Sequence, residues 1–222
     1  FTLAEKWRIP VVLYAEGGGG RPGDTDRIGL TGLDVPTFAQ FARLSGLVPL
    51  VGVVSGRCFA GNAALLGCCD VIIATKNSSI GMGGPAMIEG GGLGVYHPDE
   101  VGPVRYQVPN GVIDVLVDDE VQATEAARKY LSYFQGTIRD WRCADQRKLR
   151  QVIPENRLRV YDVRRVIELL ADEGSVLELR PEFGVGILTA FVRIEGRPSG
   201  LPATNRHHLG GALDAHPGDK AR

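Results

Sequence analysis

Short apolar runs rich in β-branched residues recur along the first half of the chain, with helical segments between them. The runs cover residues 9–15, 50–54, 71–74 and 112–117, the lengths of buried strands. Helices are predicted over residues 36–44, 60–66 and 120–135, with Asp34 as a candidate N-cap and with Gly46 and Gly136 as helix stops. Alternating strands and helices predict an α/β fold with mainly parallel strand pairing.

The second half has a different pattern. Residues 137–161 are polar and contain Pro154, which is typical of an interdomain linker. A helix is predicted over residues 163–171 and strands over 176–179 and 186–193, with a turn at residues 195–197 and an irregular tail after Asn205. We therefore expect one domain in residues 1–136, a linker in 137–161 and the beginning of a second domain in 162–222. Because the chain opens at Phe1 and the second domain stops early, we expect a piece of a longer polypeptide.

Charge and hydropathy exclude several classes of function. The formal net charge of -1 lacks the basic excess of a nucleic-acid-binding protein. No apolar run reaches the roughly 18 residues of a membrane span, and the N-terminus has no signal-peptide pattern. The four cysteines form no CxxC pair, so we expect reduced thiols, no metal site and a cytoplasmic protein.

Glycine clusters indicate where a ligand can approach the backbone. The chain has 30 glycines, and they gather at residues 17–20, 81–84 and 90–94. Without a Cβ atom, such segments adopt positive φ angles and bring their main-chain amides close to a ligand.

Residues 55–64 (SGRCFAGNAA) place a sharp turn between a buried strand and a helix of small residues. The first N–H groups of a helix have no partner within the helix, and the helix dipole adds positive charge there. The amides of Ala60 and Gly61 are therefore candidate donors to an oxyanion. A tight packing turn without chemistry is the alternative.

The same segment also approximates the nucleophile elbow of α/β-hydrolases, with Cys58 as the nucleophile. Such an enzyme needs a histidine and an acid, and no spacing singles out one of His97, His207, His208 or His216. The fifth position of the elbow is Ala60 where the pattern has glycine, so this alternative is the weaker one.

Taken together, several segments resemble the carboxyltransferase component of biotin-dependent acyl-CoA carboxylases. Residues 48–65 resemble its strand–turn–helix, residues 16–26 its glycine loop, and residues 80–94 the segment after the next strand. Residues 111–114 (GVID) resemble the motif before the last strand of its N-terminal domain, and residues 163–178 resemble the beginning of its C-terminal domain. The likeness runs through the chain in order.

The resemblance implies a crotonase-like ββα superhelix: an N-terminal carboxyltransferase domain and the truncated start of a second, similar domain. It implies that the N-terminal domain binds acyl-CoA, whose α-carbon accepts the carboxyl group of carboxybiotin. The amides of Ala60 and Gly61 match the family's oxyanion hole. No side-chain base is expected beside them, because in this family the biotin nitrogen is the base. The fragment alone is expected to be inactive.

The resemblance also implies substrate-binding residues, cofactors and partners. The residues expected to bind substrate are Gly18, Gly19, Gly20, Arg21, Arg57, Gly83, Gly84 and Pro85. Lys76 is a further candidate for CoA phosphates, whereas Glu89 is interpreted as a solvated loop carboxylate. Biotin is expected on a separate carrier domain, coenzyme A as part of the substrate, and biotin carboxylase and carrier domains as partners of a homo-oligomer.

Two other interpretations stay open. One is a different crotonase-fold enzyme, such as a hydratase, thioesterase or decarboxylase, which would need a carboxylate or nucleophile near the turn. The other is a non-catalytic CoA-binding or assembly domain, in which the Ala60 and Gly61 amides would be blocked or already hydrogen-bonded.

Overall fold

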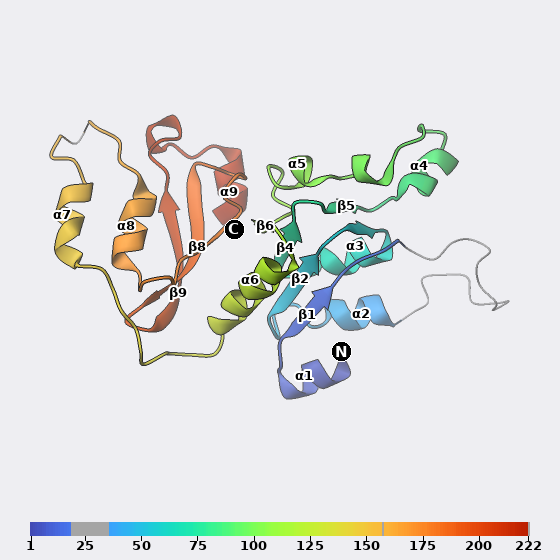
Figure 1. The fold of residues 1–222 in the computed structure, drawn as a ribbon, viewed down its shortest axis with the longest axis horizontal. Coiled ribbons are helices and arrows are strands. Elements are labelled where there is room, and N and C mark those ends of the chain that lie inside the picture. The colour runs from blue at the N-terminus through green and yellow to red at the C-terminus, as the bar shows by residue number, and fades with distance from the viewer. Residues whose placement is uncertain (19–35, 157, 222) are drawn as a thin grey trace. The chain divides into compact units, whose positions relative to one another are not determined.

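The computed structural model describes residues 1–18, 36–156 and 158–221 (Figure 1). Asp34, Gly19, Gly20 and Arg21 therefore lie outside the described residues. The chain forms two compact units. The first contains Phe1–Gln107 and Val115–Ala127, and the second contains Val108–Asp114 and Arg128–Arg222.

A four-stranded parallel sheet forms the centre of the first unit, in the order β1-β2-β4-β6 (Figure 1). Its strands are β1 (Val11–Tyr14), β2 (Leu50–Val54), β4 (Val71–Thr75) and β6 (Val115–Val117). All four lie inside the apolar runs that predicted strands or extend them by a single residue, and the expected parallel pairing is confirmed.

The two central strands of this sheet form its buried core. Every residue of β2 and β4 is buried, as expected for parallel strands covered on both faces. At one end of the sheet, Leu50 packs with Phe41, Leu44 and Val48 in a cluster that also includes Ala4. Phe41 belongs to α2 (Thr37–Ala42), and α1 (Thr2–Trp7) contributes Ala4.

A second pair of strands was missed by the sequence analysis. β3 (Arg57–Phe59) and β5 (Ser79–Gly81) pair in parallel, with Cys58 opposite Ile80. The expected strand-to-helix turn is therefore wrong in one respect: β3 lies between β2 and the helix α3 (Gly61–Leu66). Three-residue strands are too short to produce a recognisable hydrophobic period.

The second unit contains an antiparallel sheet in the order β7-β8-β9. Its strands are β7 (Leu177–Leu179), β8 (Ile187–Ile194) and β9 (Arg197–Thr204), and the turn at Glu195 and Gly196 joins the last two. The helix α8 (Val163–Leu170) places Ile167 against Leu188, Ala190 and Val192. The predicted helix and strands of this half are confirmed to within about two residues.

Other elements refine the sequence-based boundaries. The helix α6 (Glu120–Ser132) ends before Gly136, which has a positive φ of 84°. The tail after Asn205 was expected to be irregular, but it contains η3 (Leu209–Gly211) and the helix α9 (Ala215–Ala221). The remaining short helices are α4 (Pro85–Gly90), η1 (Pro98–Glu100), α5 (Val104–Gln107), η2 (Gln146–Lys148) and α7 (Leu149–Val152). Within the described ranges, no helix combines the length and the apolar content that crossing a membrane requires.

Candidate functional site

The candidate site lies where β3 leads into α3. Ala60, the residue before the helix, has φ 53° and ψ -125°, a conformation that side-chain-bearing residues rarely adopt. Its N–H donates to the carbonyl oxygen of Gly81 at 3.2 Å and so extends the β3–β5 ladder. The Ala60 amide, one of the two expected oxyanion donors, is thus engaged within the protein.

Gly61 is the first residue of α3, and its N–H has no acceptor among the residues that the structure describes. A Cβ atom on Gly61 would lie 3.1 Å from the ζ carbon of Phe38, a residue of α2. The helix start is therefore closely covered on the Phe38 side, and the Gly61 N–H is one of the unpaired donors of the first helical turn.

The glycine segment after β1 runs beside this helix start. The N–H of Gly17 donates to the Arg57 carbonyl at 2.6 Å, and the Phe59 N–H donates to the Gly17 carbonyl at 2.9 Å. Asn62 donates its side-chain amide to the carbonyl of Glu16 at 2.6 Å. Gly18 follows, and no described residue lies within 4 Å of the position where its Cβ would be. The structure thus brings Gly18 to the same locality as Gly61.

The glycine segment after β5 lies on the other side of β3. A Cβ atom on Gly84 would contact the Phe59 side chain at 3.6 Å, so Gly83, Gly84 and Pro85 lie near the β3–α3 junction. Gly84 is the N-cap of α4 and Pro85 is its first residue. Glu89 was expected in a loop; it is instead an exposed residue of α4, because Pro85 starts a helix there.

A chain of hydroxyl groups supports the turn between β2 and β3. Ser78 donates to the carbonyl of Val54 at 3.0 Å and accepts from the Gly56 N–H at 3.4 Å. Thr75 lies 3.1 Å from Ser78 and donates to Ser55 at 3.3 Å, and both Thr75 and Ser78 are buried. The sequence analysis missed these residues, because isolated Ser and Thr carry no spacing signal. The network fixes the turn that leads into β3.

This hydroxyl network ends at a carboxylate. Ser55 donates to Glu120, the first residue of α6, at 2.5 Å. The hydrogen bond lowers the pKa of Glu120 because it favours the ionised carboxylate. Glu120 is therefore an anion that anchors the turn.

The basic candidates Arg57 and Lys76 both line a cavity of about 490 Å³ together with Asn77 and Ser79. Arg57 forms an ion pair with Asp99 at 2.9 Å, and Lys76 forms one with Asp118. The hydrogen bonds from these bases lower the pKa values of both aspartates. A CoA phosphate at either base would compete with a carboxylate already present.

The nucleophile interpretation of Cys58 is wrong. Cys58 is fully buried within β3, and burial raises the pKa of its thiol to about 11, with a further contribution from Glu16. The thiolate is the nucleophilic form of cysteine, and it is negligibly populated at neutral pH with such a pKa.

The family described as the carboxyl transferase domain matches residues 2–222. The chain belongs to the carboxyl transferase domain family. This membership, predicted from the sequence, also accounts for the crotonase-like α/β fold.

Solved structures and curated proteins of the family agree with this assignment. A single-chain, multi-domain long-chain acyl-CoA carboxylase is 63% identical, with a TM-score of 0.95, over 99% of this chain and 22% of that one. A transcarboxylase 12S structure with methylmalonyl-CoA and methylmalonic acid bound is 26% identical, with a TM-score of 0.81, over 99% of this chain and 44% of that one. The methylmalonyl-CoA carboxyltransferase 12S subunit of Propionibacterium freudenreichii subsp. shermanii is 30% identical over 86% of this chain and 38% of its own length. This carboxyl transferase domain therefore spans less than half the length of these relatives.

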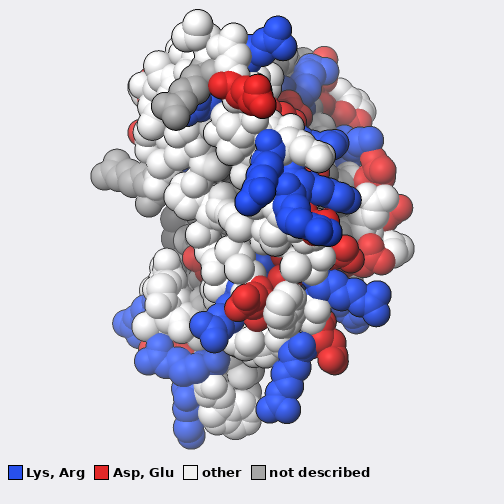
Figure 2. All heavy atoms as spheres, turned by 90° about the vertical axis from the view of Figure 1, so that its left-hand side faces the viewer, with Lys and Arg blue, Asp and Glu red and all other residues white. Residues whose placement is uncertain are grey.

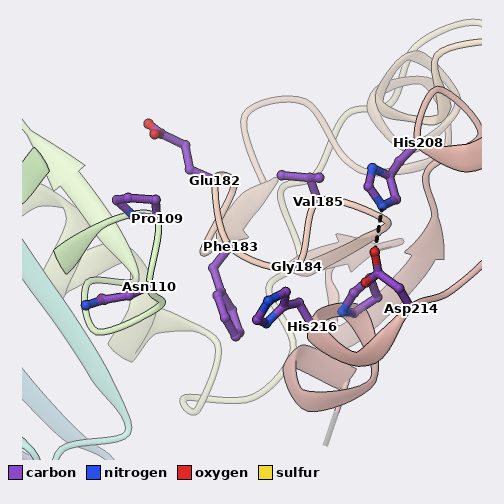
Figure 3. A pocket seen from close by; sticks show the side chains of 10 residues that line it. Pro109, Asn110, Glu182, Phe183, Gly184, Val185, His208, Asp214 and His216 are labelled. Atoms are coloured by element: carbon purple, nitrogen blue, oxygen red, sulfur yellow. Dashed lines mark hydrogen bonds and ion pairs between the residues drawn. The ribbon is translucent and has the colours of Figure 1, made fainter. Parts of the chain in front are cut away.

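Polar groups of this carboxyl transferase domain also line a cavity within the second unit. In the second unit, His208, Asp214, His216 and Phe183 line a cavity of about 380 Å³ (Figure 3). The His208 ring nitrogen Nε2 and Asp214 Oδ2 are 3.2 Å apart, and the ring of His216 lies against that of Phe183. These contacts hold α9 to its own unit. In the first unit, His97 caps η1, where its side chain accepts from the Asp99 N–H.

Charged side chains also gather over the helices α7 and α8 of the second unit. Figure 2 shows Lys and Arg side chains on the face that carries α7 and α8. Lys148 and Arg165 line a groove of about 560 Å³ there, together with Glu168. In residues 1–18, 36–156 and 158–221, no three His, Cys, Asp or Glu side chains form a metal-binding group.

Proposed function

We propose that this chain is the acyl-CoA-binding part of the carboxyltransferase of a biotin-dependent acyl-CoA carboxylase. The acyl α-carbon would accept a carboxyl group from carboxybiotin and give a malonyl-CoA-type product. The observation that carries the proposal is the Gly61 N–H, which has no protein acceptor among the described residues. This N–H lies in a chain whose residues 2–222 match the carboxyl transferase domain family.

The proposed chemistry needs a donor to a developing negative charge. Removing the α-proton of a thioester makes an enolate whose oxygen carries that charge. A fixed main-chain N–H stabilises such an oxygen by about 2.7–4 kcal/mol, by analogy with other oxyanion holes. Because Ala60 donates to Gly81, we assign this role to Gly61, with Gly18 as its neighbour. Biotin would supply the activated carboxyl group, and we assign no described residue to binding it.

We further propose that the acyl group is long. The 63% identical relative is a long-chain acyl-CoA carboxylase. Large apolar side chains also stand exposed along residues 82–95: Met82 at 66%, Met87 at 66%, Leu93 at 73% and Val95 at 78%. A row of exposed apolar side chains beside Gly83 and Gly84 offers an acyl chain a surface to bury.

The wider assembly also belongs to this proposal. The chain would act with biotin carboxylase and biotin carrier domains in the cytoplasm, and the protein would be a homo-oligomer. In support, the related 12S transcarboxylase forms a hexamer assembly and binds substrate to a multienzyme core. Within the chain, residues 1–136 would be the acyl-CoA-binding domain, 137–161 a linker and 162–222 part of the second domain.

The test is calorimetric titration of the purified chain with acetyl-, octanoyl- and palmitoyl-CoA, alongside Gly61→Pro and Gly61→Ala. Proline is tolerated at the first position of a helix but has no N–H. Alanine keeps the N–H while adding the same Cβ atom toward Phe38. We expect both variants to meet the same crowding and only the proline variant to lose the donor.

Binding that Gly61→Ala retains and folded Gly61→Pro loses supports the proposal. Equal binding by both variants would move the site away from Gly61. No binding of any acyl-CoA by the folded parent would contradict the proposal. A tighter complex with acetyl-CoA than with palmitoyl-CoA would contradict the long-chain assignment alone.

A further inference from the structure

Asn62 connects the two backbone segments that approach the proposed oxyanion site. It is the second residue of α3, directly after Gly61, and its side chain reaches the segment that follows β1. The side-chain nitrogen Nδ2 donates to the carbonyl oxygen of Glu16 at 2.6 Å, across 46 positions of sequence. Because a carbonyl can only accept, the amide orientation of Asn62 follows from its partner.

The segment that Asn62 contacts is also held by main-chain hydrogen bonds on either side of Glu16, including that from the Ala15 N–H to the Val53 carbonyl at 2.9 Å. Gly17 pairs with β3 through two main-chain hydrogen bonds and has a positive φ of 93°. Glu16, Gly17 and Gly18 are all exposed, and a side chain on Gly18 would meet nothing within 4 Å among the described residues. The hydrogen bonds of Gly17 tie the segment to β3, whereas the hydrogen bond of Asn62 ties it to α3.

We propose that Asn62 is a positioning residue for the thioester carbonyl. By holding the Glu16 carbonyl against the first turn of α3, it sets the distance between the Gly18 backbone and the Gly61 N–H. A thioester carbonyl oxygen that lies between Gly18 and Gly61 can contact both backbone segments only if the distance between them stays the same. The inference rests on the proposed function, which identifies the ligand as an acyl-CoA. The hydrogen bond of Asn62 to the Glu16 carbonyl identifies the positioning residue.

The experiment compares a thioester with a thioether. Octanoyl-CoA and S-octyl-CoA share their nucleotide and their alkyl chain, and only the first has a carbonyl group. Calorimetry gives the ratio of their two Kd values for the parent, Asn62→Asp and Asn62→Ala. Aspartate matches the shape of asparagine but presents oxygen to the Glu16 carbonyl, so it removes the donor without leaving a hole.

The matched control is Asn205→Asp in the second unit. Asn205 donates its side-chain amide to the carbonyl of Val185 at 2.8 Å, so the same substitution breaks the same kind of bond elsewhere. Asn62→Gln is the second variant at the site. The glutamine side chain keeps an amide donor at this position. Circular dichroism checks that every variant is folded.

We expect the parent to prefer octanoyl-CoA. Losing one ordinary hydrogen bond corresponds to about a 2- to 13-fold change, and we expect the preference to fall by this factor in Asn62→Asp and Asn62→Ala. We expect Asn205→Asp to keep the parent preference and Asn62→Gln to recover part of it. A merely structural role would weaken both ligands equally and leave the ratio unchanged.

Two results overturn the inference in distinguishable ways. If the parent prefers the thioester and folded Asn62→Asp and Asn62→Ala keep that preference, the positioning role is wrong while the proposed function stands. If the parent binds both ligands equally, or binds neither, the proposed function fails and the role of Asn62 fails with it. A loss of preference in Asn205→Asp as large as in Asn62→Asp also contradicts a role specific to the site.

Discussion

The main-chain N–H of Ala60 donates to the carbonyl oxygen of Gly81 at 3.2 Å. This bond continues the ladder of β3 and β5 by one residue and fixes Ala60 at φ 53° and ψ -125°. Gly61 therefore starts α3 at the end of a strand that is held rigidly on one side. The bond occupies the Ala60 amide, the first of the two candidate donors, whereas the Gly61 N–H has no acceptor among the described residues.

The strain at Ala60 predicts that Ala60→Gly stabilises the protein. A side chain in this region of φ and ψ costs on the order of 1–3 kcal/mol, whereas glycine adopts it freely. Part of this gain is offset because glycine makes the unfolded chain more flexible. We expect the free energy of unfolding in urea to rise by about 1 kcal/mol.

The control for Ala60→Gly is Ala63→Gly. Ala63 is a buried residue inside α3, where glycine lowers helix stability by about 1 kcal/mol. Opposite signs for the two substitutions would support strain at Ala60. A loss of stability in both would show that the Ala60 conformation costs nothing.

The strands next to the site could be predicted where several consecutive residues share one pattern. Every residue of β2 and β4 is buried, so Leu50–Val54 and Val71–Thr75 read as uninterrupted apolar runs. β3 and β5 were not predictable, because Arg57–Phe59 and Ser79–Gly81 are held by each other and by Gly17 rather than by a local pattern. The hydrogen bond from the Ala60 N–H to the Gly81 carbonyl depends on the pairing of β3 with β5, so it could not be predicted either.

The hydrogen-bond partners of single polar residues could not be predicted from the sequence either. Asn62, Ser78 and Glu120 have partners that lie 46, 24 and 65 positions away. A sequence without aligned relatives contains no signal for such pairs, since each residue alone is also compatible with a solvated surface position. Glycine clusters could be interpreted because their backbone freedom is a property of the residues themselves.

The cysteines are predicted to react in order of their exposure. Cys143 is exposed, whereas Cys58 is fully buried and burial raises the pKa of its thiol to about 11. Burial also raises the pKa of the Cys69 thiol to about 12. We expect iodoacetamide at pH 7.5 to label Cys143 first and to label Cys58 only after denaturation. Peptide mass mapping over time measures the order, and rapid labelling of native Cys58 would contradict the burial of β3.

Lys220 is predicted to make stability depend on pH in the alkaline range. Burial lowers the pKa of its ammonium group from 10.5 to about 8, although Glu178 acts in the opposite direction. Arg164 and Arg180 lower it further, and Lys220 donates to the carbonyl of Arg180 at 2.7 Å. Between about pH 8 and 10.5 the unfolded chain binds this proton more tightly than the folded chain does. The Lys220 contribution to the free energy of unfolding therefore rises with pH across that window.

The measurement is urea unfolding of the parent and of Lys220→Met at pH 7.5 and pH 9.5. Buried thiols such as Cys58 have raised pKa values and change stability in the opposite direction over this range, so the difference between the two proteins is the relevant quantity. We expect Lys220→Met to gain stability relative to the parent at pH 7.5 and to lose part of that advantage at pH 9.5. A difference that is the same at both pH values would show that Lys220 has an ordinary pKa in the folded state.

Arg193 is predicted to be the most costly polar side chain to remove from the second unit. It lies on β8, is 5% exposed, and donates to three main-chain carbonyls: Gly136 at 2.9 Å, Gly196 at 2.7 Å and Ser132 at 2.6 Å. These acceptors belong to the end of α6, the residues after it and the β8–β9 turn. One guanidinium group thus joins three segments of the second unit.

Replacing Arg193 with methionine keeps much of its volume but leaves those carbonyls without a donor. Each buried unsatisfied group costs about 1–3 kcal/mol, so we expect Arg193→Met to lower the free energy of unfolding by about 3–5 kcal/mol. Arg197→Met is the control, because Arg197 lies in the paired strand β9 with an exposed side chain, and we expect it to change stability by less than about 0.5 kcal/mol. Urea unfolding of both variants measures the contrast. Similar losses in the two would mean that water or the backbone satisfies the carbonyls at 132, 136 and 196 without the guanidinium group.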